Sequence, residues 1–276
     1  MMKLIHKEIL SQDKDAKIIK ITVLSPEIAQ KVKPGQFVVL MVAERGERIP
    51  LTVVERNLEE GTITLIFQEV GLTTRLLGQL NVGASLFALV GPLGHPTEIK
   101  KYGKIILIGG GVGIAEIYPV AQAFKEAGNY IETIIGSRTQ ALLILEKELR
   151  GVSDVLYVTT DDGSYGRKGF TTDVLEELLR KEKFDLVYAV GPIPMMKKVS
   201  FLTKEFGVKT IVSLNAIMLD GTGMCGCCRV EIGAKTQFSC VDGPEFDGHL
   251  VDWDGLAKRN SIYTEQEKHI CKLLIK

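Results

Sequence analysis

The first hundred residues carry short runs of branched and aromatic side chains separated by turn-forming residues. Turn signals stand at Lys33-Pro-Gly, Glu59-Glu-Gly and Asn81-Val-Gly, and residues 73–80 form the one plausible helical insert. The strands that this pattern predicts span residues 17–24, 36–42, 51–55, 62–68 and 85–90. Short strands at such regular spacing indicate a small antiparallel β-barrel over residues 1–98.

From about Lys104 the pattern changes, because short apolar runs begin to alternate with longer amphipathic ones. Strands are predicted at 104–108, 130–135, 154–159, 185–190 and 209–214, with helices ending at Glu126 and spanning 140–149, 170–183 and 194–206. This alternation predicts a parallel sheet with helices on both faces, an α/β domain over residues 99–214. Residues 215–250 are rich in loop-forming residues and 254–276 favour a helical tail, so 215–276 form a third segment.

Composition narrows the class of protein. The 276 residues are 45% hydrophobic and 25% charged, and 34 basic residues balance 34 acidic ones. This balance argues against binding to nucleic acid or to an anionic membrane. The first residues lack the apolar run of a signal peptide, and no uncharged apolar stretch is long enough to span a bilayer. We therefore expect a cytoplasmic protein.

A cluster of cysteines marks the third segment. Cys225 and Cys228 are separated by two residues, Cys240 follows after eleven more, and Asp220 precedes Cys225 by four intervening residues. With cysteine in place of the aspartate, this spacing is typical of a 2Fe–2S cluster, and crowded cytosolic thiols favour metal binding over disulfides. The alternative is structural zinc, with His249 as a further ligand.

The fourth cluster ligand is open between two residues. Asp220 could cap a turn while Cys227 supplies a thiolate, but Cys227 adjoins Cys228, and adjacent side chains rarely converge on one iron. We therefore hypothesise that Asp220, Cys225, Cys228 and Cys240 are the metal ligands.

Three loops follow strands of the predicted parallel sheet. The run Gly109-Gly-Gly-Val-Gly113 opens a helix, although Glu116 stands where a dinucleotide fingerprint has its last glycine. Gly191-Pro192 and the loop containing Asp161 follow two further strands. Because ligands bind beyond the carboxyl ends of such strands, these loops predict one nucleotide site, against the alternative of plain tight turns.

The barrel carries two weaker signals. Arg48 offers a guanidinium to a diphosphate, and Thr52 a hydroxyl to a flavin ring. Gly71, Thr73 and Thr74 precede the helical insert and offer amides and hydroxyls to phosphate. Each feature alone also suits a solvated surface or a helix cap.

In this order the motifs resemble those of the ferredoxin reductase-like flavoproteins, and more narrowly the electron-transfer subunits typified by that of dihydroorotate dehydrogenase. The phrases Glu47-Arg-Ile-Pro-Leu-Thr52, Asp161-Asp-Gly-Ser-Tyr-Gly-Arg-Lys168 and Asp220-Gly-Thr-Gly-Met-Cys225 are similar to the small subunits of NADH-dependent reduced ferredoxin:NADP oxidoreductases. The aspartate at 220 separates this group from the pyrimidine-pathway subunits, where cysteine is expected.

The resemblance implies three cofactors: FAD, NAD(H) and a 2Fe–2S cluster. It implies FAD on the barrel, at Arg48, Pro50, Leu51, Thr52, Phe67, Gln68, Gly71, Thr73 and Thr74. It implies NAD(H) over Gly110, Gly111, Val112, Gly113, Gly191 and Pro192, with Asp161 at the same edge. Ser137-Arg138 could meet a 2′-phosphate and favour NADP, or could be a capping serine and a solvated arginine; the resemblance favours NADH.

The resemblance also implies an enzyme in which hydride passes between NAD(H) and FAD, with Thr52 nearest to flavin N5. Single electrons then move to the cluster and to a larger flavin and iron–sulfur catalytic subunit in a heterodimer. That complex would couple NADH, NADPH and ferredoxin with electron bifurcation. The alternatives are the electron-transfer subunit of an NAD-dependent dihydroorotate dehydrogenase and a non-enzymatic module whose cysteines bind zinc.

Overall fold

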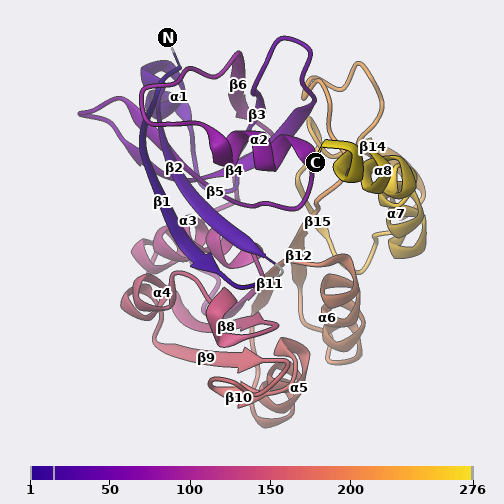
Figure 1. Ribbon diagram of the computed structural model, residues 1–276. Helices are drawn as coiled ribbons and strands as arrows, with labels where there is room; N and C mark the ends of the chain where they lie inside the picture. The colour runs from indigo at the N-terminus through magenta and orange to yellow at the C-terminus, as the bar shows by residue number, and fades with distance from the viewer. Residues whose placement is uncertain (1, 15, 275–276) are drawn as a thin grey trace.

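The N-terminal segment, from Leu4 to Leu93, forms an antiparallel barrel. The computed structural model describes residues 2–14 and 16–274 of the chain. Its six barrel strands lie in the order β1-β2-β5-β4-β3-β6 (Figure 1). They span β1 (Leu4–Gln12), β2 (Lys17–Leu24), β3 (Phe37–Met41), β4 (Arg48–Asn57), β5 (Thr62–Gln68) and β6 (Ala88–Leu93), with helices α1 (Pro26–Lys31) and α2 (Leu72–Gln79) between strands.

Alternation of side chains explains the barrel core. Ile19 and Ile21 of β2 point inward with Val38 and Leu40 of β3, and all four are fully buried. The sequence pattern misses β1, because most of its side chains are exposed or half-buried and its apolar residues do not alternate. It also misses the short helix α1.

The second sheet has seven strands in the order β10-β9-β8-β7-β11-β12-β15. Strands β7 (Lys104–Gly110), β8 (Tyr130–Ser137), β9 (Val155–Thr160), β10 (Arg167–Lys168), β11 (Leu186–Val190) and β12 (Thr210–Ser213) are parallel. The predicted helix over 140–149 is a short 3-10 turn, Gln140–Leu142, followed by α4 (Glu146–Val152). The two are separated at Leu145, whose φ of 52° breaks the helix.

Helices cover both faces of this sheet. The helices are α3 (Gly113–Glu126), α4, α5 (Thr171–Lys181) and α6 (Ile193–Glu205). Ile105 and Leu107 of β7 pack in one core with α3, whereas Ile106 and Ile108 pack in another with α5 and α6. The alternation along one strand therefore places α3 and α5 on opposite faces, as a doubly covered parallel sheet requires.

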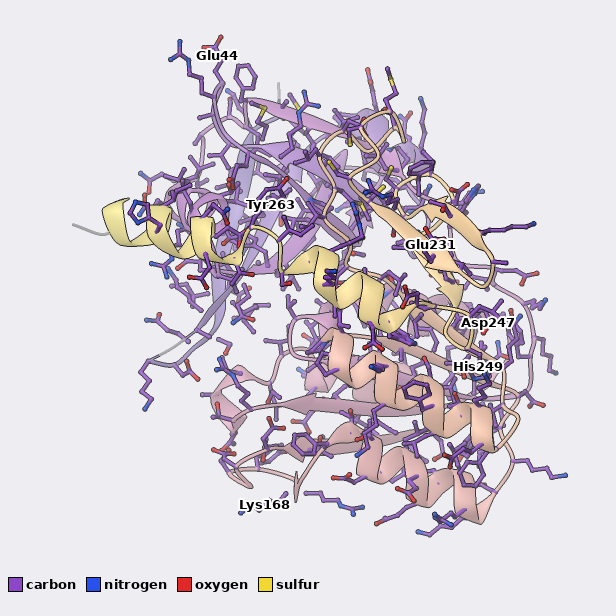
Figure 2. The ribbon with its side chains drawn as sticks, turned by 90° about the vertical axis from the view of Figure 1, so that its right-hand side faces the viewer. Glu44, Lys168, Glu231, Asp247, His249 and Tyr263 are labelled. Atoms are coloured by element: carbon purple, nitrogen blue, oxygen red, sulfur yellow. The ribbon has the colours of Figure 1, made fainter. Side chains whose placement is uncertain are left out.

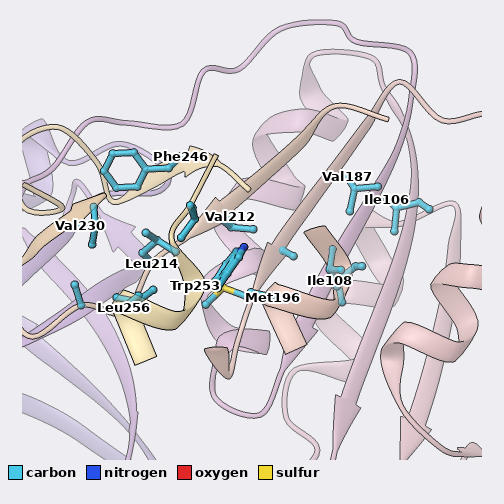
Figure 3. Close-up of a cluster of buried hydrophobic side chains, with 14 of the residues drawn as sticks. Ile106, Ile108, Val187, Met196, Val212, Leu214, Val230, Phe246, Trp253 and Leu256 are labelled. Atoms are coloured by element: carbon cyan, nitrogen blue, oxygen red, sulfur yellow. The ribbon is translucent and has the colours of Figure 1, made fainter. Parts of the chain in front are cut away.

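The C-terminal segment joins the second sheet instead of standing apart. A hairpin of β13 (Arg229–Ile232) and β14 (Lys235–Phe238) follows the cysteine loop, and β15 (Glu245–Asp247) pairs antiparallel with β12. Helices α7 (Trp253–Asn260) and α8 (Thr264–Leu274) follow, and α8 lies against α2 of the barrel (Figure 1). Figure 3 shows Trp253 of α7 beside Met196 of α6, which anchors the segment in the core of the second sheet.

No helix among the described residues is both long enough and apolar enough to cross a lipid bilayer.

Candidate cofactor and iron–sulfur sites

A cavity of about 340 Å³ lies where the barrel, the start of α3 and the C-terminal segment meet. Its wall includes Ser213, the last residue of β12, and Ala216 and Met218, which follow that strand. Seven of the residues predicted to bind cofactors line it: Pro50, Leu51, Thr52, Phe67, Gln68, Thr74 and Val112. Residues that lie far apart in the sequence are thus gathered around one space large enough to enclose part of a flexible cofactor.

Three predicted barrel residues are not among those lining this cavity: Arg48, Gly71 and Thr73. Arg48 is exposed at the first position of β4. The Thr73 hydroxyl donates to a carboxylate oxygen of Glu47 at 2.8 Å. The Thr74 hydroxyl accepts from the amide of Gly71 at 3.0 Å, so Thr74 caps α2 while it also faces the cavity.

Glu116 is a cavity residue that the sequence interpretation did not include. Its side chain lines the cavity from the first turn of α3, together with Thr52 of β4. Burial raises the pKa of the Glu116 carboxyl to about 7, and the Thr52 hydroxyl opposes that shift. The sequence does contain a signal for Glu116, because a carboxylate in the first helical turn after a glycine run lies at the strand ends. In the sequence analysis, Glu116 was noted only as a departure from the dinucleotide fingerprint.

A second cavity, of about 650 Å³, lies at the carboxyl ends of β7, β8, β9 and β11. Gly110, Gly111, Asp161 and Pro192 line it, as the nucleotide-site prediction requires. The residues not predicted there are Ile18, Gly136, Leu142, Thr159, Phe170, Thr171, Thr172, Pro194, Met195 and Lys198. Gln68 of the barrel lines both cavities, so the two spaces meet at that side chain.

The two glycine loops approach each other closely. A methyl group on Gly191 would stand 3.1 Å from the backbone of Gly110, and one on Gly113 would stand 2.5 Å from the Val190 carbonyl oxygen. The absence of side chains thus lets the start of α3 pack against the end of β11. Gly113 and Gly191 shape the cavity wall without being among its lining residues.

The second cavity has the donors that a phosphorylated ligand needs. The Thr172 hydroxyl is buried without a hydrogen-bond partner and stands in the first turn of α5, where backbone amides are free of intrahelical partners. Arg138 and Lys198 add positive charge at the wall. Burial and the neighbouring Asp162 raise the pKa of Asp161, and Arg138 opposes the shift. An orphaned hydroxyl at a helix start, with two cationic side chains lining the same cavity, fits a dinucleotide.

The cysteine loop holds two buried thiols in contact. The Sγ atoms of Cys228 and Cys240 are 3.2 Å apart, and both residues are about 1% exposed. Burial, reinforced by Cys228, raises the pKa of the Cys240 thiol to about 12. Cys225 is exposed and Cys227 half-buried. Because a thiol so placed resists ionisation, a bound cation is needed to hold it as thiolate.

Asp220 caps the loop with both carboxylate oxygens. These oxygens accept from the amides of Thr222 at 2.8 Å and Cys225 at 2.7 Å, which lowers the pKa of Asp220. The turn-capping role considered for Asp220 is therefore present. The carboxylate also contributes to the raised pKa of Cys240, so it lies near the thiol pair.

Two further features fit an iron–sulfur cluster in this loop. The Ser239 hydroxyl, next to Cys240, is buried without a partner, and Gly221 and Gly223 have φ angles of 76° and 81°. A methyl group on Gly221 would stand 2.5 Å from the Leu93 side chain, so the loop is pressed against β6. Ser239 and the glycine amides offer donors to bound sulfide.

The described residues contain no group of three or more His, Cys, Asp or Glu side chains arranged around a single metal ion. His249, the histidine considered for zinc, lies beside Asp247 (Figure 2) and shares a hydrogen bond of 3.0 Å with the Thr203 hydroxyl of α6.

Comparison with known proteins identifies the same parts. Residues 215–252 match the family model of the iron–sulfur cluster binding domain of dihydroorotate dehydrogenase B, and residues 107–200 match the oxidoreductase NAD-binding domain. The chain is 53% identical over 244 residues to the dihydroorotate dehydrogenase B electron transfer subunit homolog of Thermotoga maritima, covering 88% of this chain and 86% of that one. It is 35% identical to the probable electron transfer subunit of Methanopyrus kandleri, covering 81% and 82%.

Among solved structures, the chain is similar to one from a study of flavin-based electron bifurcation by the NADH-dependent reduced ferredoxin-NADP oxidoreductase. The identity is 47%, the TM-score 0.93, and the coverage 100% of this chain and 98% of that one. These likenesses confirm the predicted barrel plus α/β fold with an iron–sulfur segment. They also confirm the classes of cofactor predicted from the sequence: flavin, NAD(H) and an iron–sulfur cluster.

Proposed function

Because the chain belongs to the family of dihydroorotate dehydrogenase B electron transfer subunits, we propose for it the function of a flavin and iron–sulfur subunit in a larger complex. That complex is an electron-bifurcating, NADH-dependent ferredoxin:NADP oxidoreductase. The observation that carries this choice within the family is the end-to-end likeness to the structure associated with that enzyme. The aspartate at position 220, where pyrimidine-pathway subunits are expected to have cysteine, supports it.

The two cavities divide the cofactors between them. We assign FAD to the 340 Å³ cavity and the barrel around it, and NAD(H) to the 650 Å³ cavity. Bound together, they supply hydride transfer from the nicotinamide to the flavin, followed by the release of single electrons. Gln68 at the junction is placed to orient both rings, and Thr52 to donate to flavin N5.

The 2Fe–2S cluster is assigned to Asp220, Cys225, Cys228 and Cys240. Ala216 and Met218 line the flavin cavity a few residues before Asp220, and Gly221 packs on Leu93 of the barrel. The segment that walls the flavin cavity therefore continues directly into the cluster loop. This continuity supports electron passage from the flavin to the cluster within one chain.

The partner is a larger subunit with its own flavin and iron–sulfur clusters, and ferredoxin reacts through the complex. Apolar side chains beside the cysteine loop support a docked neighbour, since Met224 is 89% exposed and Leu219 43%. The second candidate function is the electron-transfer subunit of an NAD-dependent dihydroorotate dehydrogenase. It is favoured by the similarity to electron transfer subunits of dihydroorotate dehydrogenase B, and it predicts a dihydroorotate dehydrogenase partner.

The test is anaerobic purification of the native complex, followed by three assays. We expect an iron-containing flavoprotein whose copurifying subunit reduces NADP with NADH and reduced ferredoxin together, and which does not oxidise dihydroorotate. A complex that oxidises dihydroorotate with NAD would favour the second candidate. A stable monomer that reduces NADP alone would contradict the subunit proposal, and a colourless protein would contradict both.

A further inference from the structure

The flavin cavity contains a single ionisable residue. Its described lining is apolar or neutral except for Glu116, and the neutral polar side chains are Thr52, Gln68, Thr74, Ser213 and Asn215. No lysine, arginine or histidine lines the cavity to neutralise the carboxylate. Ionising a carboxyl without a cationic partner in such surroundings costs free energy, and carboxyls in this situation are candidates for functions that use their proton.

Glu116 and Thr52 come from different domains and meet across their boundary. Thr52 lies on β4, where it pairs with Phe37 of β3, and Glu116 lies in the first turn of α3, which packs on β4. Both line the flavin cavity, and the Thr52 hydroxyl acts on the ionisation of Glu116, so the residue assigned to flavin N5 neighbours a group that can carry a proton. The start of a helix favours a negative charge, and burial disfavours it. The resulting pKa of about 7 lets Glu116 exist in both forms near neutral pH.

The titratable neighbours do not compete for this role. Tyr188 of β11 senses the charge of Glu116, but its hydroxyl donates to Glu245 at 2.7 Å, and burial raises its pKa well above the ordinary value. Glu55 of β4 and Glu148 of α4 act on Tyr118, further along α3. Among the described residues, Thr52 is the group whose side chain lowers the pKa of Glu116.

We propose that Glu116 holds the proton that leaves flavin N5 during electron transfer and that Thr52 passes it between the two. This proposal rests on the proposed function, because it takes FAD in this cavity as given. A hydride brings two electrons and one proton to N5. After both electrons have left singly for the cluster, the Thr52 hydroxyl accepts the remaining proton and gives its own to the Glu116 carboxylate. In the opposite direction Glu116 returns the proton by the same route.

The first test uses the protein without cofactors. Infrared difference spectra across pH 5–9 should show a protonated carboxyl band that disappears near pH 7. Glu116→Gln should remove the band, and Glu126→Gln, at the exposed end of the same helix, should keep it. Thr52→Val should move the midpoint to higher pH, because the Thr52 hydroxyl lowers the pKa of Glu116 and valine has no hydroxyl. A band that persists in Glu116→Gln would overturn the assignment of the proton to Glu116.

The second test uses the flavin-loaded protein and separates hydride transfer from electron exit by stopped flow. Glu116→Gln should leave flavin bleaching by NADH within a few-fold of wild type but slow cluster reduction about 100-fold, the lower range of proton-transfer effects. Thr52→Val should slow cluster reduction as well, because it removes the hydroxyl that passes the proton. The pH dependence of the flavin midpoint potential should lose its break near pH 7 in Glu116→Gln and keep it in Glu126→Gln.

The outcomes separate the proposal from the function on which it depends. Flavin-loaded Glu116→Gln with an unchanged break and unchanged cluster reduction would overturn the proton-holding role alone. Protein that takes up no FAD would overturn the proposed function, and the proton-holding role with it, even where the infrared band titrates as expected.

Discussion

The hydroxyl of Tyr188 donates to a carboxylate oxygen of Glu245 at 2.7 Å, although the two residues are 57 positions apart in the sequence. The same oxygen accepts from the Thr97 hydroxyl. Tyr188 lies on β11, Glu245 on β15, and Thr97 on the connection that leaves the barrel. The three side chains therefore tie the barrel, the parallel sheet and the C-terminal segment at one buried point.

This junction predicts a stability effect without a change of fold. Tyr188→Phe should lower the free energy of unfolding by about 1–3 kcal/mol, because it leaves the half-buried Glu245 carboxyl short of a donor. In combination with Glu245→Gln the cost should be less than the sum of the single costs, since the two residues share one interaction. Urea unfolding of the four proteins measures this, with exposed Tyr130→Phe as the control. Strictly additive costs would show that the pair is not coupled.

Glu116 predicts a pH-dependent stability. Its pKa of about 7 in the folded protein exceeds the ordinary 4.5, so the folded state binds the proton more tightly than the unfolded chain. The free energy of unfolding should therefore fall as pH rises from about 4.5 to about 7 and level off above, by at most about 3 kcal/mol. Glu116→Gln should be the more stable protein at pH 8 and match wild type near pH 4.5. Parallel curves for the two cofactor-free proteins would contradict this.

The orphaned Thr172 hydroxyl predicts opposite effects on folding and binding. Thr172→Val should leave stability unchanged or slightly higher, because it removes a buried hydroxyl without a partner. It should weaken NAD(H) binding about 5- to 10-fold, the equivalent of one hydrogen bond. Calorimetric titration measures the affinity. Thr139→Val is the matched control, since its hydroxyl is also buried and unpartnered but does not line the cavity.

The cluster ligands predict a contrast between two neighbouring substitutions. Asp220→Ala should make the cluster labile, both by loss of an iron ligand and by release of the amides of Thr222 and Cys225. Cys227→Ala should leave the cluster spectrum in place. Asp220→Asn separates the two roles, because it retains an acceptor for the amides but is a poor iron ligand. Loss of the cluster in Cys227→Ala alone would assign the fourth position to Cys227.

The contacts of helix α7 with the cysteine loop predict that the loop can be loosened without changing a proposed cluster ligand. The Arg259 guanidinium donates to the Cys227 carbonyl at 2.9 Å, and the Asn260 amide donates to the Asn215 carbonyl at 2.9 Å. Arg259→Gln should speed loss of iron to a chelator several-fold, because it frees the loop from α7. Lys258→Gln, on the exposed side of α7, should not. Equal rates of iron loss would mean that α7 does not restrain the loop.

Local sequence patterns determined much of this protein. The spacing of the cysteines, the glycine run before α3 and the change of period near Lys104 each depend on residues a few positions apart. Such patterns report turns, helix starts and strand faces directly, since they reflect the geometry of short stretches of backbone. They predicted the barrel, the parallel sheet and the loops at its carboxyl edge. They missed β1, because an exposed edge strand need not alternate.

Only the tertiary structure decided which distant residues meet. The pairing of Glu116 with Thr52 depends on how α3 packs against β4, and that of Tyr188 with Glu245 on the register of β15 beside β12. The sequence places Glu116 at the strand ends but does not name its neighbour, because a glutamate in a first helical turn is ordinarily solvated. Burial by another domain changes the ionisation of that carboxyl, and burial is a property of the packed molecule.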